Sequence, residues 1–164
     1  MQAFLGYSIY KKITMENNKE IISDLKGLIH IINDGKEGYL SASEATDNLE
    51  LKAVFLKYAA ERKVYEVALK AHIAKHGGES DNDDGGILGA IHRTWIDIKE
   101  TLTGKSETAL LGAVVTGENA ALAKYDQAIH DHKLHSDHLN MLTEQRNGIA
   151  DALKEIEVLG QKYK

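Results

Sequence analysis

Four stretches of this sequence carry apolar residues at alternating spacings of four and three, and this pattern limits the fold more than any other feature. Such spacing places apolar side chains on one face of an α-helix and is typical of the seams of helical bundles. The 164 residues include no proline, and 14 glycines remain to separate the stretches. We expect helices at 17–46, 49–76, 106–131 and 134–159.

The connections predict how these helices are arranged. The first two helices are joined by a short turn at Asp47-Asn48, and the last two are also joined by a short turn, so each pair is expected to form an antiparallel hairpin. The hairpins are separated by about thirty residues that include a shorter helix at 87–102. The sequence therefore predicts an all-α, ferritin-like four-helix bundle at 17–162, with a crossover at 77–104 and a flexible extension at 1–16.

Composition and charge exclude several classes of protein. The net charge is −5 and the lysines are scattered among acidic residues, so we expect no nucleic-acid partner. No apolar run approaches the roughly 18 residues that a membrane span needs, and we expect neither a membrane partner nor a signal peptide. The absence of cysteine excludes disulfides, thiol catalysis and thiolate metal ligands, and it fits a cytoplasmic protein.

The second expected helix places a charged residue in its apolar seam. That seam consists of Leu51, Phe55, Tyr58, Arg62, Tyr65, Leu69 and His72. A buried guanidinium is tolerated only when it is paired and hydrogen-bonded, and Glu118 faces inward at a similar depth. We therefore expect a central polar layer made of Arg62, Glu118, Arg146, Tyr39, Tyr65 and Tyr125. The alternative is that one or both arginines extend to solvent between the helices.

Several stretches of the chain resemble one family. They are Asp34-Gly35-Lys36-Glu37-Gly38-Tyr39, Leu51-Lys52-Ala53-Val54-Phe55, Ala60-Glu61-Arg62, Gly77-Gly78, Gly89-Ala90-Ile91-His92-Arg93-Thr94-Trp95-Ile96-Asp97, Leu102-Thr103-Gly104 and Gly117-Glu118. Over about residues 18–130 the chain is similar to the PA2169-type four-helix-bundle family, a domain of unknown function in the ferritin-like group. The resemblance implies a bacterial, cytoplasmic helical bundle and supplies no activity.

The ferritin-like resemblance raises the question of a di-iron centre. Such centres take a Glu from each of two helices and a Glu-x-x-His pair from each of the other two. In this chain Glu61 is followed three residues later by Val64, and Glu144 is followed by Asn147. The remaining carboxylates near the inward face are Glu61, Glu66 and Glu118, which leave an atypical iron site as an alternative.

Histidines gather around the turn between the last two helices. His135 and His138 are three residues apart on one expected helix face, which suits a two-ligand zinc or nickel clamp at the surface. The competing interpretation is a polar, solvated turn without a specific ion.

No motif for a catalytic nucleophile, a phosphate-binding loop or a dinucleotide is present. We therefore expect a non-enzymatic bundle without a cofactor, acting as an interaction or stress-related module that forms a homo-oligomer, with a dimer as the expected state. The alternatives are an iron-binding bundle that uses the carboxylates above and a small-molecule binder that uses the central tyrosines.

Overall fold

The computed structural model describes residues 2–79, 106–131 and 136–164. These residues form four α-helices, α1 (Gln2–Ala45), α2 (Leu49–Lys75), α4 (Glu107–Asp131) and α5 (Ser136–Lys162), and no strand occurs in the described ranges. The prediction of an all-α four-helix bundle is confirmed. The expected short helix at 87–102 lies outside the described residues, and so does most of the expected crossover.

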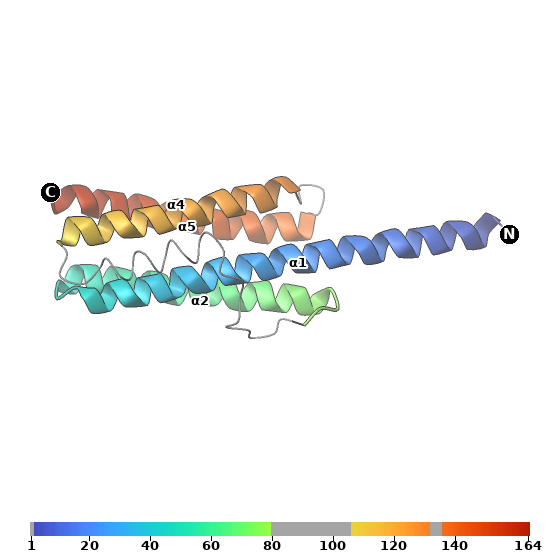
Figure 1. The fold of residues 1–164 in the computed structure, drawn as a ribbon, viewed down its shortest axis with the longest axis horizontal. Coiled ribbons are helices and arrows are strands. Elements are labelled where there is room, and N and C mark those ends of the chain that lie inside the picture. Colours follow the sequence, from blue (N-terminus) through green and yellow to red (C-terminus); the bar gives the residue numbers. More distant parts are fainter. Residues whose placement is uncertain (1, 80–105, 132–135) are drawn as a thin grey trace.

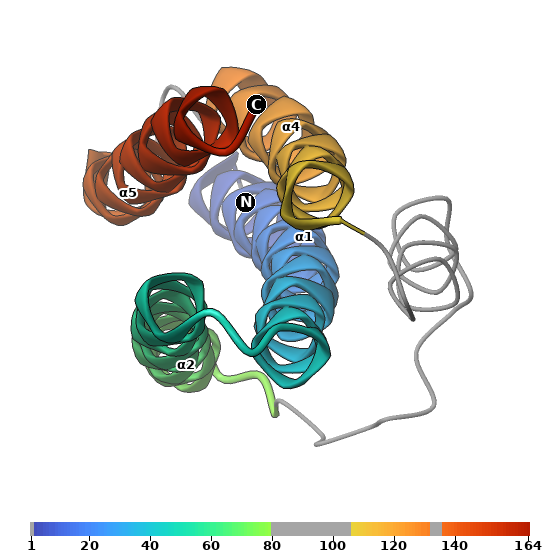
Figure 2. The same cartoon turned by 90° about the vertical axis from the view of Figure 1, so that its left-hand side faces the viewer.

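The helices form two antiparallel hairpins that lie side by side (Figures 1 and 2). One hairpin consists of α1 and α2 and the other of α4 and α5, and α1 also packs on α4. Because the helices occupy four corners, α2 faces α5 across the remaining side of the bundle (Figure 2). The amino-terminal part of α1 projects well beyond the other three helices (Figure 1).

The ends of α2 are fixed by local hydrogen bonds. Asn48 caps its amino end, where the side-chain Oδ1 accepts hydrogen bonds from the backbone N–H groups of Glu50 at 3.0 Å and Leu51 at 3.2 Å. At the other end, Gly77 adopts a φ of 77°, in the left-handed region that favours glycine. The N–H of Gly78 then donates to the carbonyl of Ile73 at 3.0 Å, which terminates the helix.

The core consists of two apolar clusters on either side of a polar layer at the middle of the bundle. Towards the turn between α1 and α2 lie residues such as Leu51, Phe55, Val114, Ala152 and Ile156. Towards the other end lie residues such as Leu25, Ile32, Leu69, Leu142 and Ile149. The polar layer between these clusters is therefore enclosed by apolar side chains along the bundle axis.

The amino terminus differs from the sequence prediction. Helix α1 begins at Gln2, so residues 2–16 are helical where a flexible extension was expected. Gly6 is the only glycine in this segment and proline is absent from it, so no strong helix breaker separates it from the buried part of α1.

Candidate functional site

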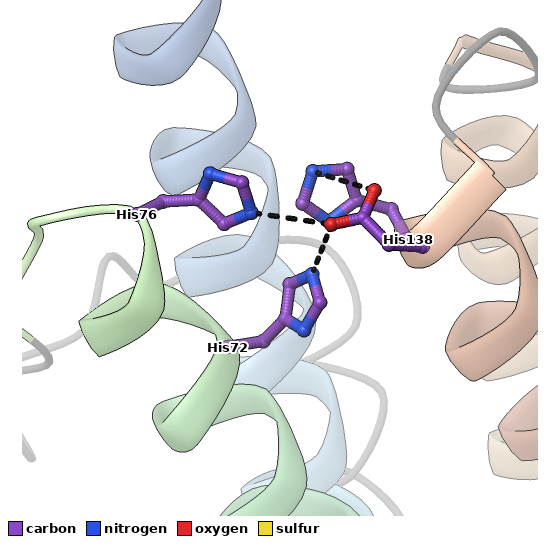
Figure 3. Close-up of side chains that lie close together, drawn as sticks. His72, His76 and His138 are labelled. Atoms are coloured by element: carbon purple, nitrogen blue, oxygen red, sulfur yellow. Dashed lines mark ion pairs between the residues drawn. The ribbon is translucent and has the colours of Figure 1, made fainter.

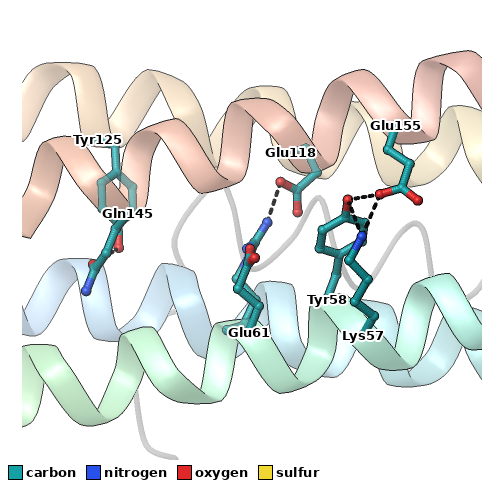
Figure 4. A network of polar contacts seen from close by, with 8 residues as sticks. Lys57, Tyr58, Glu61, Glu118, Tyr125, Gln145 and Glu155 are labelled. Carbon is teal, nitrogen blue, oxygen red and sulfur yellow. Dashed lines mark hydrogen bonds and ion pairs between the residues drawn. The ribbon is translucent and has the colours of Figure 1, made fainter.

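The middle of the bundle is organised around Arg62, which is 1% exposed and is the largest of the fully buried side chains. Its Nη2 donates to Glu118 Oε2 at 2.7 Å, and its Nη1 donates to Glu61 Oε1 at 2.6 Å (Figure 4). Glu118 is also 1% exposed, whereas the side chain of Glu61 is 31% exposed. The expected Arg62–Glu118 pair is therefore present, and it joins α2 to α4.

Aromatic rings surround this ion pair. The guanidinium carbon of Arg62 lies 5.6 Å from the ring centroid of Tyr39 and 5.6 Å from that of Tyr65, within the range of cation–π attraction. Tyr65 also approaches α5 so closely that a Cβ at position 148 would collide with its hydroxyl, so a larger residue in place of Gly148 would require the Tyr65 side chain to move. Two of the three predicted tyrosines thus lie directly beside Arg62.

The electrostatics of the layer follow from burial and pairing. Burial lowers the pKa of the Arg62 guanidinium, but the neighbouring Glu118, Tyr39 and Glu61 outweigh this effect and hold its pKa above the ordinary value. Burial raises the pKa of the Glu118 carboxyl, although Arg62 opposes the shift. Burial likewise raises the pKa of the Tyr39 hydroxyl. The layer therefore holds one permanent positive charge among tyrosines that stay neutral.

Tyr125 forms a second polar contact further along the bundle. Its hydroxyl donates to Gln145 Oε1 at 2.7 Å, and Gln145 Nε2 donates to the backbone carbonyl of Tyr65 at 3.4 Å (Figure 4). Both side chains are buried. Tyr125 was expected in the central layer from the sequence, and here it is joined to Gln145 on α5.

Arg146 does not belong to the central layer, and that part of the prediction is wrong. Its Nε donates to Asp126 Oδ1 at 2.8 Å, and its side chain is 34% exposed. The buried positions of α5 include Leu142, Gln145 and Ile149, so the inward position at this level is 145 rather than 146. A rotation of one residue on the helical wheel accounts for the error.

The alternative carboxylate site for iron is not assembled either. Glu61 and Glu118 both bind Arg62, whereas Glu66 accepts hydrogen bonds from Lys70 Nζ at 2.6 Å and Lys63 Nζ at 2.9 Å. Burial raises the pKa of Glu66, but these lysines outweigh it and lower the pKa to about 2. The three carboxylates are neutralised by cationic side chains from the protein and do not form a ligand set of the ferritin-like kind.

Long polar side chains bridge α2 and α5 along the length of the bundle, and we refer to these contacts as the α2–α5 seam. The seam includes Glu50 with Lys162 at 2.6 Å and Lys57 with Glu155 at 2.8 Å. The hydroxyl of Tyr58 also donates to Glu155 (Figure 4). The two hairpins therefore meet along this side through hydrogen bonds and ion pairs.

A group of three histidines and one aspartate lies at the end of the α2–α5 seam. His72 lies in the last turn of α2, His76 caps the carboxyl end of α2, and His138 lies in the first turn of α5 (Figure 3). Asp137 precedes His138 in the same turn of α5. Asp137 Oδ2 lies 3.6 Å from His72 Nε2 and 3.6 Å from His76 Nε2, and Asp137 Oδ1 lies 3.9 Å from His138 Nε2. Burial and the neighbouring His76 lower the pKa of His72, which favours the neutral imidazole.

Comparison with known families adds one positive result. A family model described as a domain of unknown function (DUF2383) matches residues 20–131, which contain most of α1 and all of α2 and α4. The chain belongs to the DUF2383 family. A search of curated proteins finds no match to it. Among the described parts of this DUF2383 chain, no helix is long and apolar enough to cross a membrane.

The histidine group of this DUF2383 protein was only partly predicted. His138 was named with His135 as a surface clamp, but His138 is buried at 1% exposure and His135 lies outside the described residues. Sequence reasoning did not assign a ligand role to His72, His76 or Asp137. The available signal was the spacing of four between His72 and His76, which places two imidazoles on one face of a helix.

Proposed function

We propose that this DUF2383 protein is a non-enzymatic interaction module that self-associates as a dimer through the first turns of α1. The supporting observation is a run of seven large apolar side chains within residues 4–15 that are 52–84% exposed. They are Phe4, Leu5, Tyr7, Ile9, Tyr10, Ile13 and Met15. Single exposed apolar residues are common on soluble proteins, but a continuous group of this size marks an interaction surface.

The distribution of these residues around α1 argues for contact with a partner. At 100° per residue, Phe4 and Ile13 lie about 180° apart, so opposite sides of the helix are both apolar. A helix that is apolar on all sides is normally buried, and an isolated helix of about 15 residues is marginal in water. Contact with another helix would therefore bury the apolar side chains of residues 2–15 and stabilise this part of α1.

The size and charge of this segment favour a second copy of the chain. Aromatic side chains bury about 150–250 Å² each, so the seven residues offer on the order of the 800 Å² per partner that a standard interface buries. Residues 2–15 carry Lys11 and Lys12 and no acidic residue, whereas the whole chain has a net charge of −5. A second copy supplies both an apolar helix and an acidic bundle.

The centre of the bundle supports a role without catalysis. Ferritin-like di-iron proteins hold their metal ligands in the bundle core, and the core of this bundle contains the Arg62–Glu118 pair beside Tyr39 and Tyr65. We propose that the protein is a cytoplasmic, ferritin-like bundle of the PA2169 type in which this ion-pair layer stands in place of a di-metal centre. A stress-related role is part of the same proposal.

The oligomeric state tests this proposal. Light scattering coupled to size exclusion, over a wide range of micromolar concentrations, should give a dimer for the full chain and a monomer for a variant with serine at Phe4, Tyr7 and Tyr10. The matched control places serine at three exposed apolar positions of α2, namely Leu56, Val64 and Val67, and should remain a dimer. A monomeric full chain, or equal dissociation of both variants, would overturn the proposal.

A further inference from the structure

We propose that His72, His76, Asp137 and His138 form a binding site for one divalent transition-metal ion of the zinc class. Each residue offers one ligand atom, and these atoms all lie within 4.8 Å of one another. The ligands come from α2 in one hairpin and α5 in the other (Figure 3). This site is distinct from the carboxylates at mid-bundle and from the exposed turns of α1.

The distances fit a shared ion better than direct hydrogen bonds. Hydrogen bonds from nitrogen to oxygen are about 2.7–3.2 Å long, whereas Asp137 Oδ2 lies 3.6 Å from both His72 Nε2 and His76 Nε2. Two ligands that are each about 2.0–2.1 Å from one tetrahedral zinc ion lie roughly 3.4 Å apart. A shift of a few tenths of an ångström would bring Asp137 Oδ2 to this spacing from each of the two nitrogens. The four ligand atoms all lie within 4.8 Å of one another, so the most distant pairs would have to close by up to about 1.4 Å.

Burial gives an independent reason for a ligand at this point. Within the described part of the chain, the Nε2 atoms of His72 and His76 are buried and have no hydrogen-bond partner. Buried polar atoms are normally hydrogen-bonded, because leaving them unsatisfied costs free energy. A metal ion on these two nitrogens would satisfy both of them at once.

The scaffold holds the imidazoles close together. His72 and His76 are one helical turn apart, with ring centroids separated by 5.2 Å. The His138 ring lies 4.4 Å from that of His72 and 4.6 Å from that of His76, as measured between centroids. The three rings are therefore close enough for one ion to be shared among them.

The donor set selects the kind of ion. Three imidazole nitrogens and one carboxylate oxygen suit zinc, copper, nickel or cobalt, whereas calcium and magnesium prefer oxygen ligands throughout. Four protein ligands fill a tetrahedral coordination sphere, which is typical of structural rather than catalytic zinc. The nearby Lys75 Nζ, 3.8 Å from Asp137 Oδ2, belongs to a side chain that is 65% exposed and can turn to solvent when an ion binds.

Bound metal would join the two hairpins at one end of the α2–α5 seam. The other seam contacts described above are ion pairs and hydrogen bonds between long side chains, several of which are exposed to solvent. An ion coordinated by α2 and α5 would add metal–ligand bonds between the two hairpins, whereas the exposed ion pairs contribute little stability. The expected consequence is a metal-dependent rise in the melting temperature.

Metal titration of the full-length, untagged protein tests the site. After treatment with EDTA, titration with Co²⁺ should give the visible absorption of tetrahedral cobalt, and Zn²⁺ should displace it at one ion per chain. His76→Gln should weaken Zn²⁺ binding by at least about tenfold, since even changes outside the ligand shell cost 10–100-fold. His130→Gln, at an exposed histidine outside the group, is the matched control and should bind as the wild type does.

The outcomes separate this site from its alternatives. Circular dichroism of each variant would establish that it is folded, and the melting temperature with and without Zn²⁺ would give a second measurement. Absence of tetrahedral Co²⁺ absorption, unchanged binding by folded His76→Gln, or an equal loss in His130→Gln would overturn the proposal. These outcomes do not depend on self-association through α1, because none of the four residues lies in its first turns.

Discussion

Replacement of Glu118 by alanine is the sharpest test of the central layer. The change leaves the Arg62 guanidinium buried, with the partly exposed Glu61 as its remaining carboxylate partner. Two unit charges at about 4 Å interact by about 4 kcal/mol at an effective dielectric constant of about 20. The desolvation of Glu118 offsets part of this interaction, whereas the cavity left by the lost side chain adds to the cost. We expect the free energy of unfolding to fall by about 3–4 kcal/mol.

Urea denaturation followed by circular dichroism at neutral pH would measure this loss. Glu118→Gln keeps the volume and one acceptor for Arg62, so it should cost about 1–2 kcal/mol. The double change of Arg62 and Glu118 to leucine removes both charges and should be within about 2 kcal/mol of the wild type, or more stable. Glu157→Ala on the exposed face of α5 is the control, with an effect below about 0.5 kcal/mol. If Glu118→Ala costs no more than this control, the pairing argument is refuted.

Three further changes probe other parts of the structure. Glu66 has a folded-state pKa of about 2, below its ordinary value of 4.5, so its stabilisation is present above pH 4.5 and is lost as the pH falls towards 2. Glu66→Gln should therefore lower the free energy of unfolding by about 2 kcal/mol at pH 7. Measured by urea denaturation, the free energy of unfolding of this variant should change less between pH 4.5 and pH 2 than that of the wild type. An unchanged pH profile would contradict the assignment. Asn48→Ala removes the cap of α2 and the donor to Glu107 at 3.0 Å, and should lower stability by about 2 kcal/mol. Asn48→Ser, which keeps a capping oxygen without placing a charge beside Glu107, should lose less, and equal losses would remove the cap from the explanation. Tyr125→Phe leaves Gln145 Oε1 without its 2.7 Å donor and should lower the thermal midpoint, corresponding to about 1–2 kcal/mol; an unchanged midpoint would show that the bond contributes nothing.

The fold and most of the central layer could be predicted because both follow from the order of residues along a helix. The seam of α2 places Arg62 among Phe55, Tyr58 and Leu69, and the structure buries all four. A buried arginine requires a carboxylate, and Glu118 is the inward-facing one on α4. The pairing was thus accessible from periodicity and the cost of burying charge.

The other site residues depend on how the hairpins are placed against each other, which periodicity does not give. Arg146 and Gln145 are adjacent on α5, and only the rotation of that helix decides that Gln145 faces inward while Arg146 reaches Asp126. The histidine group likewise depends on how the two hairpins pack against each other. His76 and His138 are far apart in the sequence, and their contact depends on the register between α2 and α5.

The α2–α5 seam also has a consequence for the order of folding. Helices α1 and α2 are joined by a short turn, so their contacts close short loops and form early. The seam pairs Lys57 with Glu155, 98 residues apart, and Glu50 with Lys162, 112 residues apart. Closing such long loops costs more chain entropy than closing the short turn of a hairpin, and exposed ion pairs offset little of this cost. We therefore expect each hairpin to form first and the α2–α5 side of the bundle to close in the last step of folding.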